Sequence, residues 1–201
     1  MRGRVVVLGE LSGREAAALI VDGRLEDLLI EPPEDAGPGV GAILRAVADR
    51  PMKGQGAMFV ALPGGATGYL RETGGIAPGA AVIVQVTGHA EPGKAIPVMR
   101  RVLFKGRHAI VTPDAPGRNI SRRIRDDEAR ARLAALAEAG MAGSAFGLIL
   151  RSAAADAASD DVAGEIASLR ALAEEIMRDA TGGPELLLDA PSPHEEAWRD
   201  W

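Results

Sequence analysis

The sequence has no cysteine, few aromatic residues and no long apolar run. The absence of cysteine excludes disulfides, zinc–thiolate and iron–sulfur sites, and a thiol nucleophile. No apolar stretch approaches the roughly 20 residues that a transmembrane helix needs, and the apolar run at the amino terminus is too short for a secretory signal. We therefore expect a cytoplasmic protein that has no membrane as a partner.

Recognisable catalytic motifs are also missing. The three histidines, His89, His108 and His194, lie far apart in the sequence and lack the spacing of metal ligands. Neither a nucleophile elbow nor a Walker or dinucleotide-binding loop is present. Two neighbouring acids, Asp126 and Asp127, are better explained by helix capping than by acid–base catalysis. We thus predict no catalytic residue, no metal site and no cofactor in this chain.

The charge of the chain is unevenly distributed. Its 201 residues carry a formal net charge of −5, yet residues 94–132 contain eleven Lys or Arg and only four Asp or Glu. With 47% hydrophobic residues, the chain can form one large domain or two small ones with a substantial core. A strongly basic segment in an acidic protein is typical of a chain that binds a polyanion.

The patterning predicts an α+β protein that begins with a small antiparallel sheet. Two apolar runs flank Asp22-Gly23, which favours a type I′ hairpin turn because both central residues must adopt positive φ. A Pro- and Gly-rich stretch at residues 31–39 cannot continue a sheet and indicates a boundary. We therefore expect a hairpin unit at residues 1–34.

The next segment, residues 35–104, is predicted to form a small barrel. Pro63-Gly64-Gly65 provides one of the tight turns that separate its apolar runs. Five short strands at this spacing favour an OB-type fold, with a β-sandwich fragment as the alternative. The expected strands cover residues 42–47, 57–62, 67–71, 81–86 and 96–104.

Strands and helices alternate in residues 105–190. We expect strands at residues 106–111, 146–150 and 185–189, and helices at 126–139 and 159–180, the second capped by Ser159 or Asp160.

A further helix is predicted for residues 191–201. Ser192-Pro193-His194-Glu195 has the pattern of a capping box with proline at the first helical position. Trp198 and Trp201 would share one apolar face of this helix. Either they dock on the rest of the protein or the chain is one piece of something longer, and the second alternative is favoured.

Three groups of residues are candidates for RNA binding. Phe59 and Tyr69 lie on successive strands, and Lys94 follows a glycine-containing loop; rings on an OB sheet stack bases, and a lysine beside them contacts phosphate. Arginines at residues 107 and 118–125 lie near tight turns and suit phosphate, although a solvated face balanced by nearby acids is the alternative. Arg151-Ser152 ends an apolar strand, where a structural salt bridge is the alternative to a ligand site.

A series of motifs extends over nearly the whole chain. It comprises residues 82–87, Pro92-Gly93-Lys94, Gly106, Ile110-Val111-Thr112-Pro113, residues 119–124 (Asn-Ile-Ser-Arg-Arg-Ile) and residues 147–153 (Gly-Leu-Ile-Leu-Arg-Ser-Ala). This order resembles the bacterial ribonuclease E/G family. The resemblance implies an endoribonuclease that cleaves single-stranded RNA and prefers a 5′-monophosphate end.

The resemblance also implies an architecture. Residues 1–34 correspond to part of an RNase H-like domain, residues 35–104 to an OB-fold RNA-binding domain, residues 105–190 to an α/β 5′-sensor, and residues 191–201 to the start of a following segment. The family's magnesium-binding aspartates, and the cysteine pair that forms oligomers through zinc, would follow Trp201. Magnesium and a homo-oligomer are therefore expected only with those further segments, and whether this chain alone is an enzyme is left open.

Site residues follow from the resemblance by position. Phe59, Tyr69 and Lys94 match the RNA contacts of the OB fold, with Tyr69 in place of a usual Phe. The residues that match the 5′-phosphate pocket are Gly106, Ile110, Arg122, Arg151 and Ser152. Ile110 replaces a usual Val, and Ser152 replaces Thr while it keeps the hydroxyl. A stand-alone RNA-binding regulator without catalytic activity and a protein that binds a small phosphorylated ligand are the alternative functions.

Overall fold

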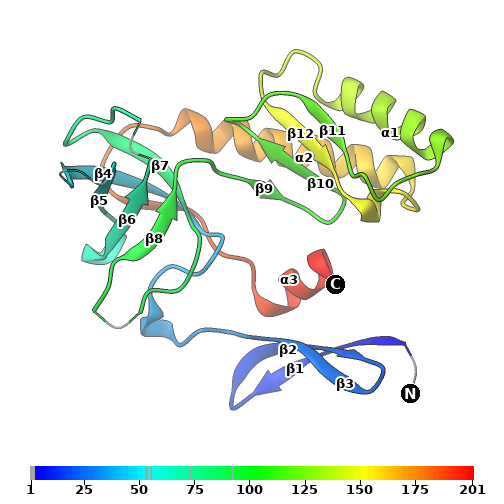
Figure 1. Ribbon diagram of the computed structural model, residues 1–201, viewed down its shortest axis with the longest axis horizontal. Coiled ribbons are helices and arrows are strands. Elements are labelled where there is room, and N and C mark those ends of the chain that lie inside the picture. Colours follow the sequence, from blue (N-terminus) through cyan, green and yellow to red (C-terminus); the bar gives the residue numbers. More distant parts are fainter. Residues whose placement is uncertain (1–2, 53, 55, 73, 92) are drawn as a thin grey trace.

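The computed structural model describes residues 3–52, 54, 56–72, 74–91 and 93–201, so Pro92 of the motif series lies outside the described residues. The fold is α+β, as expected, with three sheets and, within the described residues, three α-helices (Figure 1). None of these helices is long and apolar enough to cross a lipid bilayer. In Figure 1 the barrel lies on the left, a helix-covered sheet at the upper right and a separate small sheet below.

The amino-terminal sheet is antiparallel. Its strands, in the order β1-β2-β3, are β1 (Arg4–Leu11), β2 (Arg14–Val21) and β3 (Arg24–Ile30). Asp22 and Gly23 join the last two strands at φ 49° and 80°, which confirms the predicted turn. Only β2 buries side chains in this sheet, and exposed apolar residues such as Val7 and Leu25 lie on its neighbours.

A closed barrel follows. Its strands are β4 (Ile43–Pro51), β5 (Ala57–Ala61), β6 (Thr67–Arg71), β7 (Ala81–Val86) and β8 (Ile96–Met99). The order β4-β5-β6-β8-β7 closes through pairing of β7 with β4, and β6 runs parallel to β8. Closure excludes the β-sandwich alternative and agrees with an OB-like barrel. Leu44, Met58, Val60 and Leu70 fill the interior.

The fifth predicted barrel strand is wrong beyond Met99. Strand β8 ends there, and Phe104 instead belongs to a second, four-stranded sheet of order β11-β12-β10-β9. Its strands are β9 (Phe104–Lys105), β10 (Ala109–Thr112), β11 (Arg118–Ile120) and β12 (Gly147–Leu150). The predicted strand over residues 106–111 is thus shifted, because Gly106 to His108 form a bend between β9 and β10.

Two helices cover this sheet, α1 (Asp127–Gly140) and α2 (Ser159–Arg178), with Leu133 and Ile166 in the shared core. Asp126 caps α1 by accepting a hydrogen bond from the Ala129 amide, as predicted. The predicted cap of α2 is wrong: its N-cap is Ala158, and the Ser159 hydroxyl instead accepts a hydrogen bond from Arg132. Short 3-10 turns occur at Glu34–Ala36, Pro63–Gly65 and Ser152–Ala154.

The barrel is joined to the helical region along β4. The strand predicted near residue 185 forms as β13 (Glu185–Leu188), which pairs with β4. Leu44, Ala46 and Ala48 of β4 point into the barrel, whereas Ile43 packs in the core of the helical region. Arg45, only 6% exposed, donates to the Gly183 carbonyl at 2.8 Å and pairs with Asp179 and Glu185. These contacts attach the segment after α2 to the barrel wall.

The last helix, α3 (Pro193–Asp200), docks between the amino-terminal sheet and the four-stranded sheet (Figure 1). The predicted capping box is confirmed, since the side chains of Ser192 and Glu195 each bond the other's backbone amide. The His194 amide donates to Glu15 of β2, and its Nε2 lies 3.0 Å from the Ala16 carbonyl. The helix therefore docks on the protein, although Trp198 keeps 70% of its surface exposed.

Candidate nucleic-acid interface

Two aromatic rings lie side by side on the outer surface of the barrel. Phe59 of β5 and Tyr69 of β6 are direct cross-strand partners, with ring centroids 6.1 Å apart and ring planes at 60°. Because side chains alternate along a strand, the neighbours Met58, Val60 and Leu70 point inward and these two rings point outward. Phe59 is 37% exposed, so its ring is available to a ligand rather than part of the core.

A cavity of about 820 Å³ opens beside the two rings and is also lined by Lys94. The ammonium group of Lys94 lies 2.6 Å from the carboxylate of Glu91. Both side chains are well exposed, so this ion pair is weak and its lysine can exchange the carboxylate for another anion. The three residues predicted to bind RNA therefore line one cavity.

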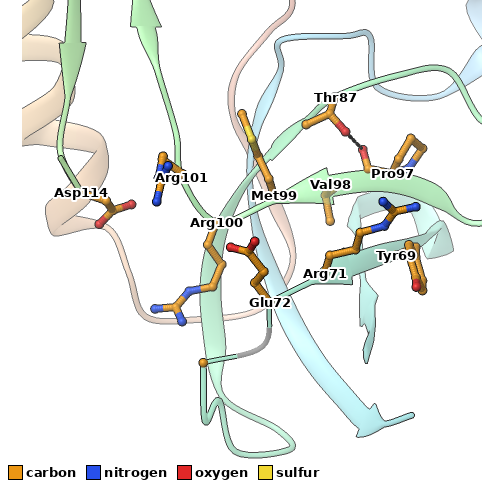
Figure 2. Close-up of a pocket in the computed structure, with 11 residues that line it drawn as sticks. Tyr69, Arg71, Glu72, Thr87, Pro97, Val98, Met99, Arg100, Arg101 and Asp114 are labelled. Carbon is orange, nitrogen blue, oxygen red and sulfur yellow. Dashed lines mark hydrogen bonds between the residues drawn. The ribbon is translucent and has the colours of Figure 1, made fainter. Parts of the chain in front are cut away.

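A second cavity, of about 870 Å³, shares Tyr69 with the first (Figure 2). Arginines from two elements line it: Arg71 ends β6, and Arg100 and Arg101 follow β8. The Arg71 guanidinium lies 5.8 Å from the centre of the Tyr69 ring, within the range of a cation–π contact.

The residues predicted to form the phosphate pocket gather at one end of the four-stranded sheet. Ile120 of β11 pairs in parallel with Leu150 of β12, and Leu150 also pairs with Ala109 of β10. The ends of β11 and β12 and the start of β10 are therefore neighbours. This arrangement brings together the backbones of Gly106, Ile110, Arg122, Arg151 and Ser152.

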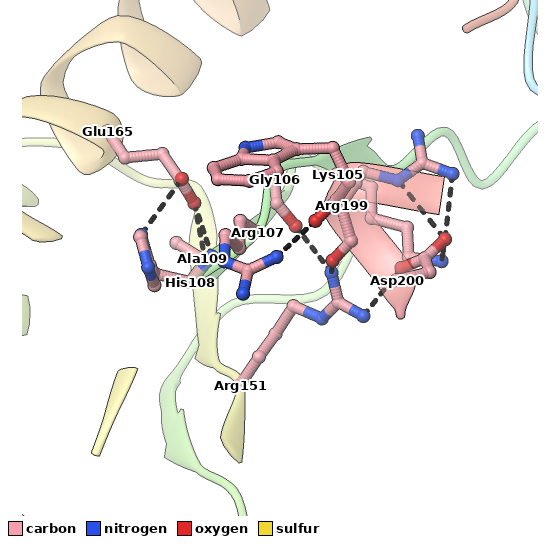
Figure 3. A network of polar contacts seen from close by, with 10 residues as sticks. Lys105, Gly106, Arg107, His108, Ala109, Arg151, Glu165, Arg199 and Asp200 are labelled. Carbon is pink, nitrogen blue, oxygen red and sulfur yellow. Dashed lines mark hydrogen bonds and ion pairs between the residues drawn. The ribbon is translucent and has the colours of Figure 1, made fainter. Parts of the chain in front are cut away.

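Arg151 is held in place by several partners (Figure 3). Its Nη1 donates to the Gly106 carbonyl at 2.6 Å and to the Arg199 carbonyl at 3.1 Å. Its Nη2 pairs with the carboxylate of Asp200 at 2.6 Å. The structural salt bridge that was predicted as the alternative to a ligand site at Arg151 is thus present. The Nε–H and one hydrogen of Nη2 have no partner within the described part of the chain.

Asp200 is the acid at the centre of this network. Burial would raise the pKa of its carboxyl group, but hydrogen bonds from Lys105, Arg199 and Arg151 outweigh burial and lower the pKa to about 2. The Lys105 ammonium group lies 2.7 Å away. Asp200 is therefore an anion at neutral pH, and three cations surround it.

Gly106 has a packing role in the structure. The Glu165 carboxylate accepts hydrogen bonds from the amides of His108 and Ala109 at 2.7 and 2.8 Å (Figure 3). A Cβ atom on Gly106 would lie 2.4 Å from the Glu165 Oε1 atom. A glycine at residue 106 thus leaves the space that this carboxylate occupies.

Arg107 donates to the Trp198 carbonyl, and its guanidinium lies over the Trp198 ring, 4.8 Å from the ring centre. The other arginines of the basic segment after Arg107 fall into two groups. Arg118, Arg130 and Arg132 donate to backbone carbonyls, for example Arg118 Nη1 to Phe146 at 2.7 Å, so they stabilise the fold. Arg122 and its neighbours Arg123 and Arg125 are exposed. Among the described residues no acid lies within ion-pair distance of these three side chains, which are therefore solvated. The basic segment therefore does not converge on a single surface.

Several residues of these sites were missed by the sequence interpretation. Arg71 follows Tyr69 by two residues in β6, so the two side chains share the outer face of the barrel. Asp200 and Glu165 contact groups that lie 49 and 57 residues away in sequence, which no local pattern reports. The alternation of inward and outward residues around Tyr69 was the one signal that could have revealed Arg71.

A comparison with protein families identifies the carboxyl-terminal part. The model of the ribonuclease E/G family matches residues 104–201, which include the whole four-stranded sheet, α1, α2 and α3. This segment belongs to the ribonuclease E/G family. Membership suggests a role related to RNA binding or ribonuclease function. No curated protein matches the chain. The RNase E/G match covers the residues predicted to form the phosphate pocket, whereas the aromatic pair on the barrel precedes it.

Proposed function

We propose that the chain binds single-stranded RNA as the substrate-recognition part of an RNase E/G-like endoribonuclease that acts in RNA processing and decay. The observation that carries this proposal is the outward-facing Phe59–Tyr69 pair beside Lys94 in one cavity. Aromatic rings on an OB-like sheet bind unpaired bases by stacking, which tolerates different sequences. The family match supports RNA as the partner. Recognition, and not bond cleavage, is the role proposed for these residues.

The four parts of the chain have distinct roles in this proposal. Within residues 35–104, the barrel holds the bases of a single strand. Residues 105–190 act as a 5′-sensor, and residues 1–34 contribute part of an RNase H-like domain. The final residues, 191–201, dock against the sensor through α3.

We further propose that the end of the four-stranded sheet binds a 5′-monophosphate. Two N–H groups of Arg151 that lack partners within the described residues can donate to phosphate oxygens while the Asp200 pair persists. The exposed hydroxyl of Ser152 and the guanidinium of Arg122 add donors from the same sheet end. Gly106 and Ile110 shape the wall of this pocket.

The first test compares RNA binding by the full chain and by Phe59→Ala. A short oligouridine should bind wild type. Phe59→Ala should lose roughly 1–3 kcal/mol of binding free energy, because one stacking contact is removed. Leu25→Ala, which removes an exposed apolar side chain from the amino-terminal sheet, is the matched control and should bind as wild type does. Equal affinities of wild type and Phe59→Ala would refute the stacking site.

A second test addresses the phosphate pocket. Affinities of 5′-phosphorylated and 5′-hydroxyl forms of one oligonucleotide are measured for wild type, Arg122→Ala and Arg151→Gln. Wild type should prefer the phosphorylated form, and both variants should lose that preference. Arg125→Ala, an exposed arginine of the same loop, should keep it. If wild type binds both forms equally well, 5′-phosphate recognition is refuted while RNA binding by the barrel stands.

A further inference from the structure

The second cavity is lined by cationic side chains that the proposed stacking of bases in the first cavity does not account for. Figure 2 shows the guanidinium groups of Arg71, Arg100 and Arg101 around it, with Tyr69 at one side. We name the three arginines and the cavity they line the arginine cleft. The cleft lies where the barrel meets the loop between β10 and β11, which contributes Asp114.

The guanidinium groups of the arginine cleft are available to a ligand. All three arginines are exposed, and within the described ranges none of them forms an ion pair or a side-chain hydrogen bond. This distinguishes them from Arg118 and Arg151, most of whose donors bond groups of the protein. Two acids, Glu72 and Asp114, also line the cleft and leave it with one excess positive charge. A bound anion would thus meet a modest net attraction and several fork-shaped donors.

The backbone beside the cleft is fitted closely to Arg100. Glu72 adopts φ 61°, an unusual conformation for a residue other than glycine. At Gly74, a Cβ atom would lie 2.5 Å from the Arg100 Nη1 atom. Gly74 therefore lies against this guanidinium, and its φ of 53° also favours glycine at this position. Strained backbone of this kind is concentrated at ligand-binding segments.

Tyr69 connects the arginine cleft with the aromatic site. Its ring lines both cavities, and Arg71 lies against it at 5.8 Å. A strand whose bases stack on Phe59 and Tyr69 would reach the cleft with its adjoining backbone. The charge there suits phosphodiesters, which need donors but no base-specific contacts.

We propose that the arginine cleft holds the backbone phosphates of the RNA segment that adjoins the bases stacked on Phe59 and Tyr69. This inference rests on the proposed function and extends the RNA path of the barrel toward the four-stranded sheet. The cleft is then a sequence-independent electrostatic contact, separate from the 5′-phosphate pocket.

Two 5′-hydroxyl oligouridines test this inference on the full chain, one of four nucleotides and one of twelve, so that the 5′-phosphate pocket is not involved. Binding is measured for wild type and for the double variant Arg100→Gln/Arg101→Gln at several salt concentrations. The double variant should bind the long oligonucleotide roughly tenfold more weakly. Its log–log salt slope should be smaller by about 1.4, since each phosphate contact in a single strand contributes about 0.7. The short oligonucleotide, held by the rings, should change less than twofold.

The control is Arg50→Gln, which removes another exposed arginine, near the end of β4, that lines neither cavity. It should leave the affinity of the long oligonucleotide unchanged. Circular dichroism of each variant verifies the fold, which the replacement of exposed arginines should not alter. Gly74→Ala, which displaces the Arg100 guanidinium without removing charge, should weaken only the long oligonucleotide.

Three results would overturn the inference. If the double variant binds the long oligonucleotide as wild type does while Phe59→Ala weakens both lengths, the cleft is not part of the path and the proposed function stands. Equal losses for both lengths would place the arginines at the stacked bases. If wild type binds neither oligonucleotide, the proposed function itself fails and the cleft fails with it.

Discussion

The carboxylate of Asp200 in α3 lies 2.6 Å from the guanidinium of Arg151 at the end of β12, although 49 residues separate them in sequence. The same carboxylate contacts Lys105 of β9 at 2.7 Å. One acid of the last helix thus joins two strands of the sheet. This single group orients the arginine on which phosphate recognition is proposed to depend.

Replacing Asp200 by Asn should make the free energy of unfolding vary less with pH in the acidic range. The folded-state pKa of about 2 lies below the ordinary value of 3.8, so ionised Asp200 stabilises the protein above pH 3.8. That contribution declines as pH falls through 3.8 and is lost below about 2. We expect Asp200→Asn to cost about 1 kcal/mol at pH 7, a figure reduced for partial solvation, and close to nothing near pH 2.

Urea unfolding of wild type and Asp200→Asn between pH 2 and 7 measures this difference. Asp156→Asn, at an exposed acid that has no ion-pair partner in the described part of the chain, is the control and should cost little at any pH. A constant difference between wild type and Asp200→Asn across the range would show that Asp200 stabilises by packing rather than by charge.

Gly106→Ala should destabilise the protein through Glu165. The added methyl group would displace a carboxylate that bonds two backbone amides, so we expect a loss of about 2 kcal/mol. A double-mutant cycle with Glu165→Ala tests the cause. If Glu165 is responsible, Gly106→Ala should cost little once Glu165 has been removed; additive losses would contradict this explanation.

Arg45→Met should loosen the attachment of the segment after α2. The guanidinium is buried and bonds Gly183, Asp179 and Glu185, but both acids are about half exposed and can be rehydrated. We therefore expect a loss of about 2 kcal/mol rather than the larger cost of a fully buried pair. Urea unfolding measures the loss, and hydrogen exchange should show faster exchange in β13. Unchanged exchange in that strand would contradict this role of Arg45.

Tyr69→Phe should bind RNA within about twofold of wild type, because the proposed contact uses the ring face and not the hydroxyl. Phe59→Leu keeps the apolar character but loses the π-face, and should weaken binding roughly tenfold. Fluorescence anisotropy with one oligouridine compares the two. Equal affinities of Phe59→Leu and wild type would show that apolar contact alone suffices.

Local chemistry made much of the fold predictable. Asp22-Gly23 and Pro63-Gly64-Gly65 specify turns through their backbone preferences, and the Ser192–Glu195 pair specifies the start of α3. The end of β8 was not predictable in this way. Its apolar pattern continues to Phe104, yet Arg100 and Arg101 interrupt pairing, and the chain passes there from the barrel to the next sheet.

Contacts between distant segments were beyond sequence reasoning. Pairing of β13 with β4 joins residues 140 positions apart, and the sequence of neither strand indicates which strand it pairs with. The pairing of Phe59 with Tyr69 on the barrel was easier to predict, because the two residues face each other across a short turn. Arg151 and Ser152 follow a recognisable strand, but the carboxylate that orients Arg151 comes from another element.

Burial of β4 on both sides has a consequence for any attempt to isolate the barrel. A fragment that ends at residue 104 would expose Ile43 and Ile83, which pack in the core of the helical region. It would also leave the guanidinium of Arg45 without any of its partners and open an unpaired strand edge where β13 had been. Such a fragment would tend to aggregate, and the barrel and the region beyond it should unfold as one cooperative unit.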